Sequence, residues 1–122
     1  MFLVFLCLLN SNLYKENLKF NANLRYTTDG FSAAVLRTVC KKAEEPVQTY
    51  YNRADLPGGS TLGNISLSHV SVPSVDIGLP QLAMHSCYET AAVRDALYLE
   101  DAMAAYYGST LKCQGTSAYC LK

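Results

Sequence analysis

The stretch from Leu18 to Tyr51, LKFNANLRYTTDGFSAAVLRTVCKKAEEPVQTYY, decides the fold class, because it predicts a strand, a helix and a second strand in succession. LKFNANLRY is typical of a strand that runs out into a loop. TTDGFSAAVLRTVCKKA predicts a helix, in which Thr28 or Asp29 caps the first turn by accepting hydrogen bonds from its exposed N–H groups. Pro46 ends this helix, and VQTYY is a short run of strand-forming residues.

The rest of the chain continues the alternation of strand and helix. The glycines of PGGSTLG predict a loop, after which Ser60 or Thr61 caps a short helix. PSVDIGLP predicts a strand bounded by prolines, and a long helix is expected from about Tyr88 to Tyr107. The C-terminal segment STLKCQGTSAYCLK has no hydrophobic period and is expected to be coil.

The predicted order is βαβαβα, which indicates an α/β fold with helices packed on a mostly parallel or mixed sheet. Three strands make a thin sheet, and its open edges need to be covered or continued by other segments. The predicted core takes its residues from the apolar side of each element: Phe31, Val35, Val39, Ile65, Val75, Ile77, Ala96, Leu99 and Met103.

The N-terminal run MFLVFLCLLN leaves three interpretations open. Its apolar part, Phe2 to Leu9, is too short to span a bilayer. It has the length of a signal-peptide core, but no Lys or Arg precedes it and no A-x-A-like cleavage site follows. A signal peptide, a buried strand that fills an open sheet edge and an artefactual start are the alternatives.

Composition excludes several function classes. The chain has 122 residues, which suits one domain, and its 10 Lys+Arg and 10 Asp+Glu give a formal net charge of zero. A neutral chain has no electrostatic footprint for nucleic acid or an acidic membrane surface. The 5 cysteines show no C-x-x-C spacing, so no zinc finger or redox motif is predicted. We expect a reduced, cytoplasmic protein.

His85 is the strongest single candidate for chemistry. It lies a few residues beyond the strand SVDIG, in the loop before the long helix, and ligands of open α/β sheets bind beyond the carboxyl ends of strands. The alternative is that His85 only fixes the turn through a hydrogen bond to backbone. His69 is interpreted as a half-buried helix histidine.

The glycine-rich loop PGGSTLG is a second candidate, because a loop of this kind at the start of a helix presents N–H groups to an anion. It lacks the lysine of a phosphate-binding P-loop, and a tight loop that needs small residues explains it equally well. No acid pair or G-x-S-x-G motif is evident.

Four stretches, in this order and at this spacing, carry a family resemblance: NANLRYTTDGFSAAV, RADLPGGSTLGNIS, VDIGLPQLAMHS and the helix after it. Together they resemble the C-terminal part of the catalytic domain of the aspartyl aminopeptidase and vacuolar aminopeptidase I family of zinc exopeptidases. The resemblance divides the chain into an unmatched segment (1–18), the family part (19–111) and a tail (112–122). Residues 1–18 are expected to add little to function or folding.

The resemblance implies a peptidase with two zinc ions per site that releases N-terminal, acidic residues from peptides. The metals polarise the carbonyl and activate a water. The histidine of the family's MHS motif is a metal ligand, which implies this role for His85. A lysine and a tyrosine of the family line the substrate pocket and match Lys19 and Tyr26; a lysine suits the carboxylate of an acidic residue. The resemblance implies further substrate contacts at Gly58, Gly59, Ser60 and Met84.

The chain also departs from the family pattern. The other metal ligands, the general-base glutamate and an inserted domain used in assembly belong to segments that this sequence does not contain. The resemblance therefore implies a piece of a homo-oligomeric enzyme, without catalytic residues of its own and inactive alone. Two alternatives are a non-catalytic remnant or interaction module, and a secreted protein with a Cys113–Cys120 disulfide.

Overall fold

The computed structural model describes residues 3–6, 16–55, 59, 61–115 and 118–122. Its central part follows the predicted βαβαβα order. The elements of this part are β2 (Glu16–Phe20), α1 (Gly30–Lys42), β3 (Val47–Tyr51), α2 (Leu62–His69), β4 (Ser74–Gly78) and α3 (Val93–Gly108). The α/β prediction is confirmed.

The sheet has four strands in the order β1-β4-β2-β3. The additional strand is β1 (Leu3–Leu6), which pairs in parallel with β4. Strands β2 and β3 are parallel to each other, whereas β2 is antiparallel to β4, so the sheet is mixed, as predicted. The N-terminal run therefore contributes a strand beside β4, which agrees with the interpretation that it fills an open sheet edge. The boundary expected after residue 18 falls inside β2.

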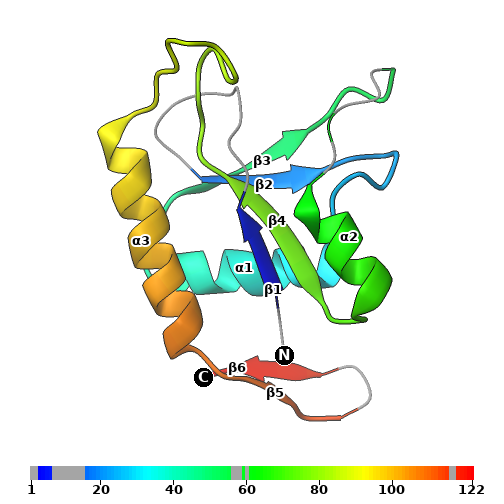
Figure 1. Ribbon diagram of the computed structural model, residues 1–122. Helices are drawn as coiled ribbons and strands as arrows, with labels where there is room; N and C mark the ends of the chain where they lie inside the picture. Colours follow the sequence, from blue (N-terminus) through cyan, green and yellow to red (C-terminus); the bar gives the residue numbers. More distant parts are fainter. Residues whose placement is uncertain (1–2, 7–15, 56–58, 60, 116–117) are drawn as a thin grey trace.

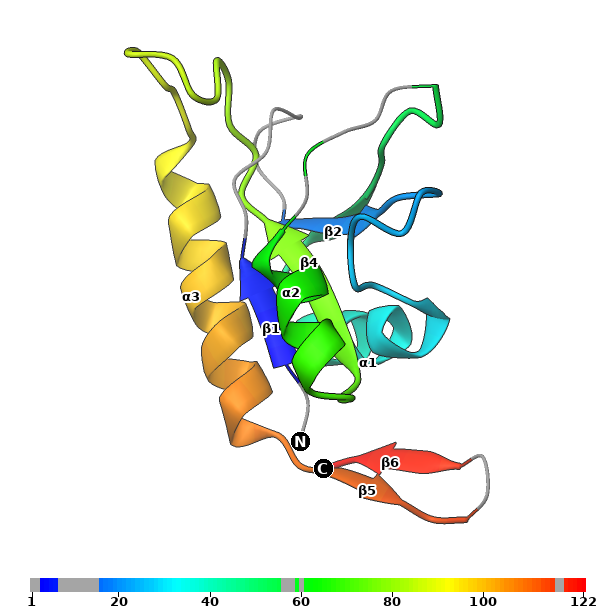
Figure 2. The same ribbon diagram turned by 45° about the vertical axis from the view of Figure 1, so that its right-hand side comes forward.

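The helices cover both faces of the sheet. Figure 2 shows α2 in front of β4 and α1 behind it, and both figures show α3 along the left side. Side chains on β4 alternate between the two faces, because successive residues of a strand point in opposite directions. All five residues of β4 are buried, so a polar side chain in this strand has no access to water.

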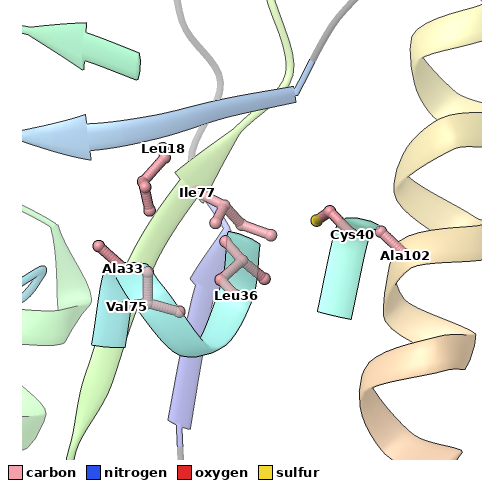
Figure 3. Packing of buried hydrophobic residues seen from close by; sticks show 7 residues of the cluster. All are labelled: Leu18, Ala33, Leu36, Cys40, Val75, Ile77 and Ala102. Atoms are coloured by element: carbon pink, nitrogen blue, oxygen red, sulfur yellow. The ribbon is translucent and has the colours of Figure 1, made fainter. Parts of the chain in front are cut away.

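The hydrophobic core lies between the sheet, α1 and α3. Figure 3 shows Leu18 and Ile77 of the strands directed toward Leu36 of α1, with Ala102 of α3 next to Cys40. The buried cluster consists of Leu18, Ala33, Leu36, Cys40, Val75, Ile77 and Ala102. The predicted core residues Val35, Val39, Val75 and Ile77 are buried, whereas Phe31, Leu99 and Met103 are half-buried.

Two predicted core residues are exposed. Ile65 is 60% exposed, because the short helix α2 buries only Gly63. Ala96 is exposed because α3 turns Asp95 and Ala102 toward the interior instead. His69, at the end of α2, is exposed and not half-buried.

The prediction that the C-terminal segment is coil was wrong. This segment forms a second, two-stranded sheet from β5 (Leu111–Cys113) and β6 (Tyr119–Leu121). Cys113 and Cys120 in this hairpin are free thiols. Further backbone hydrogen bonds join Thr110 and Lys122 in both directions, at 2.8 and 3.0 Å, and the amino group of Lys42 donates to the carbonyl of Leu121 at 2.8 Å. The hairpin is thereby attached to α1. No helix in the described part has both the length and the apolar character needed to cross a membrane.

Candidate functional site

His85 lies in the loop that joins β4 to α3. Backbone hydrogen bonds close this loop at its base, where the N–H of Leu82 donates to the carbonyl of Thr90 at 2.8 Å and the N–H of Thr90 donates back at 3.2 Å. At its tip the N–H of Ser86 donates to the carbonyl of Ala83 at 2.9 Å. His85 itself is exposed, as a residue that reaches a ligand from outside the chain must be.

The carboxylate of Glu89 connects three parts of this loop. One oxygen accepts from the backbone N–H of His85, and the other accepts from the side-chain amide of Gln81. His85 has a φ of +69°, a left-handed conformation that is unfavourable for a residue with a side chain. The Glu89 carboxylate thus binds the N–H of the residue whose backbone is under strain.

Lys19 and Tyr26 are brought together. The amino group of Lys19 lies 5.2 Å from the centre of the Tyr26 ring, within the range of a cation–π contact. Lys19 is fully buried in β2, and Tyr26 is half-buried in the loop that follows this strand. The family resemblance implies that both residues line the substrate pocket, and the structure shows that their side chains are in contact.

Asp76 is a polar residue at the same place that sequence reasoning did not select. It is fully buried in β4, and continuing the β2–β4 register by one residue sets it opposite Lys19. One carboxylate oxygen accepts from both the N–H and the hydroxyl of Thr27, at 2.6 and 2.9 Å. The signal in the sequence was a single carboxylate inside the apolar, proline-bounded run PSVDIGLP. Such a residue must find its hydrogen-bond donors within the protein.

The two groups of candidates lie at opposite ends of the sheet. Because β2 and β4 are antiparallel, the loop after β4 that carries His85 leaves where β2 begins, whereas Tyr26 follows the end of β2. Figure 1 shows the first loop at the upper left and the second at the right. Met84, next to His85, is half-buried.

The glycine-rich loop is described only in part. Gly58 and Ser60 lie outside the described residues, while Gly59 is exposed and a Cβ built on it would meet nothing within 4 Å. At Gly59, close packing therefore does not require glycine. Of the two predicted cap residues of α2, Ser60 and Thr61, the N-cap position is occupied by Thr61. The Thr61 side chain makes no cap hydrogen bond.

The described residues do not form a complete metal site. They contain no group of three or more His, Cys, Asp and Glu side chains placed to hold one ion. A structural or catalytic zinc ion needs about three to four protein ligands, and the described residues do not place such a set around His85.

Comparisons with known proteins place the chain in a family of metallopeptidases. The sequence model of the family described as "Aminopeptidase I zinc metalloprotease (M18)" matches residues 14–107. "Probable M18 family aminopeptidase 2" of Mycobacterium tuberculosis (strain ATCC 25618 / H37Rv) is 43% identical over 94 residues, which are 77% of this chain and 22% of that protein. The chain belongs to the M18 family of aminopeptidases, and it spans about one fifth of the length of the relatives that it matches.

Solved structures agree with this assignment. The structure titled "Cryo-EM structure of the Ape4 and Nbr1 complex" contains a chain that is 33% identical, with a TM-score of 0.74 over 77% of this chain and 18% of that chain. The S. cerevisiae mApe1 dodecamer matches with a TM-score of 0.68 over 86% of this chain and 26% of that chain, at 17% identity. At that identity the second match shows the fold alone.

Proposed function

We propose that this chain is a segment of a zinc aminopeptidase catalytic domain and that it contributes one metal ligand, His85. The observation that carries this proposal is the position of His85, exposed on a closed loop after the central, fully buried strand of the sheet. Ligand sites of α/β sheets form beyond the carboxyl ends of strands, which is where this loop lies. When bound in the complete enzyme, zinc would polarise the scissile carbonyl and activate a water.

We infer that the remaining ligands and the general base belong to the part of the relatives that this chain does not span. The described residues offer one imidazole at the loop and not a full set of donors. A single imidazole does not hold zinc against water at ordinary zinc concentrations. The family site with two zinc ions is therefore completed only together with the rest of the catalytic domain.

We propose that Lys19 and Tyr26 contact the substrate in the complete enzyme, with Gly58, Gly59, Ser60 and Met84 as further contacts. Support comes from the close approach of the Lys19 amino group to the Tyr26 ring. In the complete enzyme, a lysine ammonium that faces the substrate pocket would make a charge-assisted contact with a carboxylate, which is strong where water is excluded. This chemistry suits a peptide with an acidic N-terminal residue. Because Tyr26 follows the end of β2 and His85 follows the end of the antiparallel strand β4, further segments must complete the pocket.

We further propose a homo-oligomeric complete protein in the cytoplasm. The mApe1 structure among the neighbours is a dodecamer, which supports assembly of M18 chains in general. Reduced cysteines support a reducing compartment, since the four described cysteines are free.

Activity assays on the purified chain test the proposal. The chain is mixed with zinc, cobalt or manganese and offered a peptide analogue with an N-terminal aspartyl or glutamyl residue and a chromogenic leaving group. We expect no metal-dependent hydrolysis, because two bound metals need more ligands than this chain supplies. Hydrolysis that copurifies with the chain and disappears in His85→Ala would overturn the proposal that the site is incomplete.

A further inference from the structure

The loop that carries His85 contains two strained backbone positions. Ala83 and His85 both have positive φ values, +52° and +69°, and neither is glycine. A residue with a Cβ adopts this conformation at a cost in free energy, so some contact in the folded loop has to offset it. The base of the loop is fixed by the hydrogen bonds between Leu82 and Thr90, but these lie several residues from His85 along the chain.

Glu89 makes the contact that reaches His85. Its carboxylate accepts from the N–H of His85 on one oxygen and from the side chain of Gln81 on the other. Gln81 lies in the segment that follows β4 and is only 4% exposed, so it connects the carboxylate to the body of the domain. A charged acceptor makes stronger hydrogen bonds than a neutral one.

We propose that Glu89 is a positioning residue, whose carboxylate holds the backbone of His85 in its left-handed conformation and so forms the loop before any metal binds. The proposal rests on the proposed function in one respect: a preformed loop matters for function only if His85 binds a metal. The hydrogen bond and its effect on the loop exist in the chain without metal.

Amide hydrogen exchange of the 122-residue chain, followed by NMR without added metal, tests this proposal. In the unsubstituted chain the amides of His85, Leu82 and Thr90 should be protected. In Glu89→Ala they should exchange about tenfold faster, the factor expected when a hydrogen bond to a charged group is lost. Glu100→Ala removes an exposed carboxylate on α3 and should leave these three amides unchanged.

A rescue experiment separates strain at His85 from a general loosening of the loop. Glycine has no penalty at positive φ, so His85→Gly combined with Glu89→Ala should restore the protection of Leu82 and Thr90. Glu89→Gln keeps the size of the side chain but presents one acceptor and one donor group, and it should give intermediate exchange rates. If Glu89→Ala does not fold, the exchange rates of Glu89→Gln test the proposal in its place.

Two results would overturn the proposal. Unchanged exchange at His85, Leu82 and Thr90 in both Glu89 variants would show that the carboxylate does not hold the loop. Equal loss of protection in Gln81→Ala and Glu89→Ala, without rescue by His85→Gly, would show that Glu89 acts only through Gln81. Neither result bears on metal binding by His85, because no metal is present in these measurements.

Discussion

One oxygen of the Asp76 carboxylate accepts two hydrogen bonds from Thr27, from the N–H at 2.6 Å and from the hydroxyl at 2.9 Å. The next residue, Thr28, accepts from the N–H of Asp76 through its hydroxyl at 2.9 Å. These contacts fix the loop between β2 and α1 to the middle of β4. They also determine where Tyr26 lies relative to Lys19, since Tyr26 directly precedes Thr27 in the chain.

Replacing Asp76 should therefore destabilise the fold. Asp76→Ala removes two hydrogen bonds to a charged group and leaves the Thr27 N–H without its acceptor, so we expect the free energy of unfolding to fall by about 3 kcal/mol. Urea denaturation measures this change. Glu100→Ala, at an exposed position on α3, should change stability by less than about 0.5 kcal/mol. Equal effects of the two substitutions would show that Asp76 does not anchor the loop.

The two N-caps of α1 and α2 provide a matched test of capping. The Asp29 side chain accepts from the N–H of Ser32, and the Ser32 side chain accepts in return from the N–H of Asp29, which makes a capping box. Asp29→Ala should cost about 1 kcal/mol. Thr61→Ala should be close to neutral in the same urea measurement, since the Thr61 hydroxyl makes no cap hydrogen bond. A larger loss from Thr61→Ala than from Asp29→Ala would contradict this account.

Glu45 predicts a dependence of stability on pH. Burial, together with the nearby carboxylate of Asp101, raises the pKa of Glu45 above its ordinary value. The folded state then binds this proton more tightly than the unfolded chain, so the contribution to stability is present at low pH and is lost as the pH rises through the folded pKa. Glu45→Gln should accordingly raise the free energy of unfolding at neutral pH, with a gain that shrinks below about pH 4.

Glu44→Gln, a change of the same kind at the preceding exposed position, provides the control. It should leave the difference between neutral and acidic pH as in the unsubstituted chain. A Glu45→Gln variant whose stability gain does not vary with pH would contradict the raised pKa of Glu45.

We expect strand β1 to prevent association between chains in solution. It covers one edge of the central strand β4, and an uncovered strand edge promotes pairing with other chains. Deletion of residues 1–6 should therefore produce larger species in light scattering as the concentration rises. Only alternate N–H groups of β1 face β4, so of the two substitutions Val4→Pro and Phe5→Pro, one removes a hydrogen bond between these strands. That substitution should also produce larger species in light scattering. A deletion variant that stays monodisperse would show that β1 is dispensable.

The strands and α1 could be predicted from the sequence because their signals are local. Proline and glycine bound the apolar run of β4, and a capping residue precedes the periodic segment of α1. The hairpin of β5 and β6 was missed because a strand of three residues leaves no periodic pattern in the sequence. These two strands form only because they pair with each other. Likewise, no local signal announces that β1 would pair with β4 across most of the chain.

The buried faces of α2 and α3 could not be predicted from apolar residues alone. Helix α2 is short and turns a glycine inward, and α3 buries the carboxylate of Asp95 in a stripe that an apolar pattern cannot reveal. For the site, the structure brings the Lys19 amino group to 5.2 Å from the centre of the Tyr26 ring, while their role toward a substrate stays a prediction. The roles of Asp76 and Glu89 depend on hydrogen bonds between elements or across a loop, which only the fold determines.

The central claim, that this segment brings one metal ligand to an M18 catalytic domain, is tested most directly in a chimera. The matching segment of the Mycobacterium tuberculosis relative is replaced by residues 14–107 of this chain, and zinc content and aminopeptidase activity are measured together. We predict that the chimera binds zinc and hydrolyses substrate. His85→Ala should lower activity at least about a hundredfold with loss of zinc, because even the loss of a residue that only hydrogen-bonds to a metal ligand costs about 10- to 100-fold. His69→Ala should change neither. A folded chimera that keeps its zinc and its activity in His85→Ala would contradict the account.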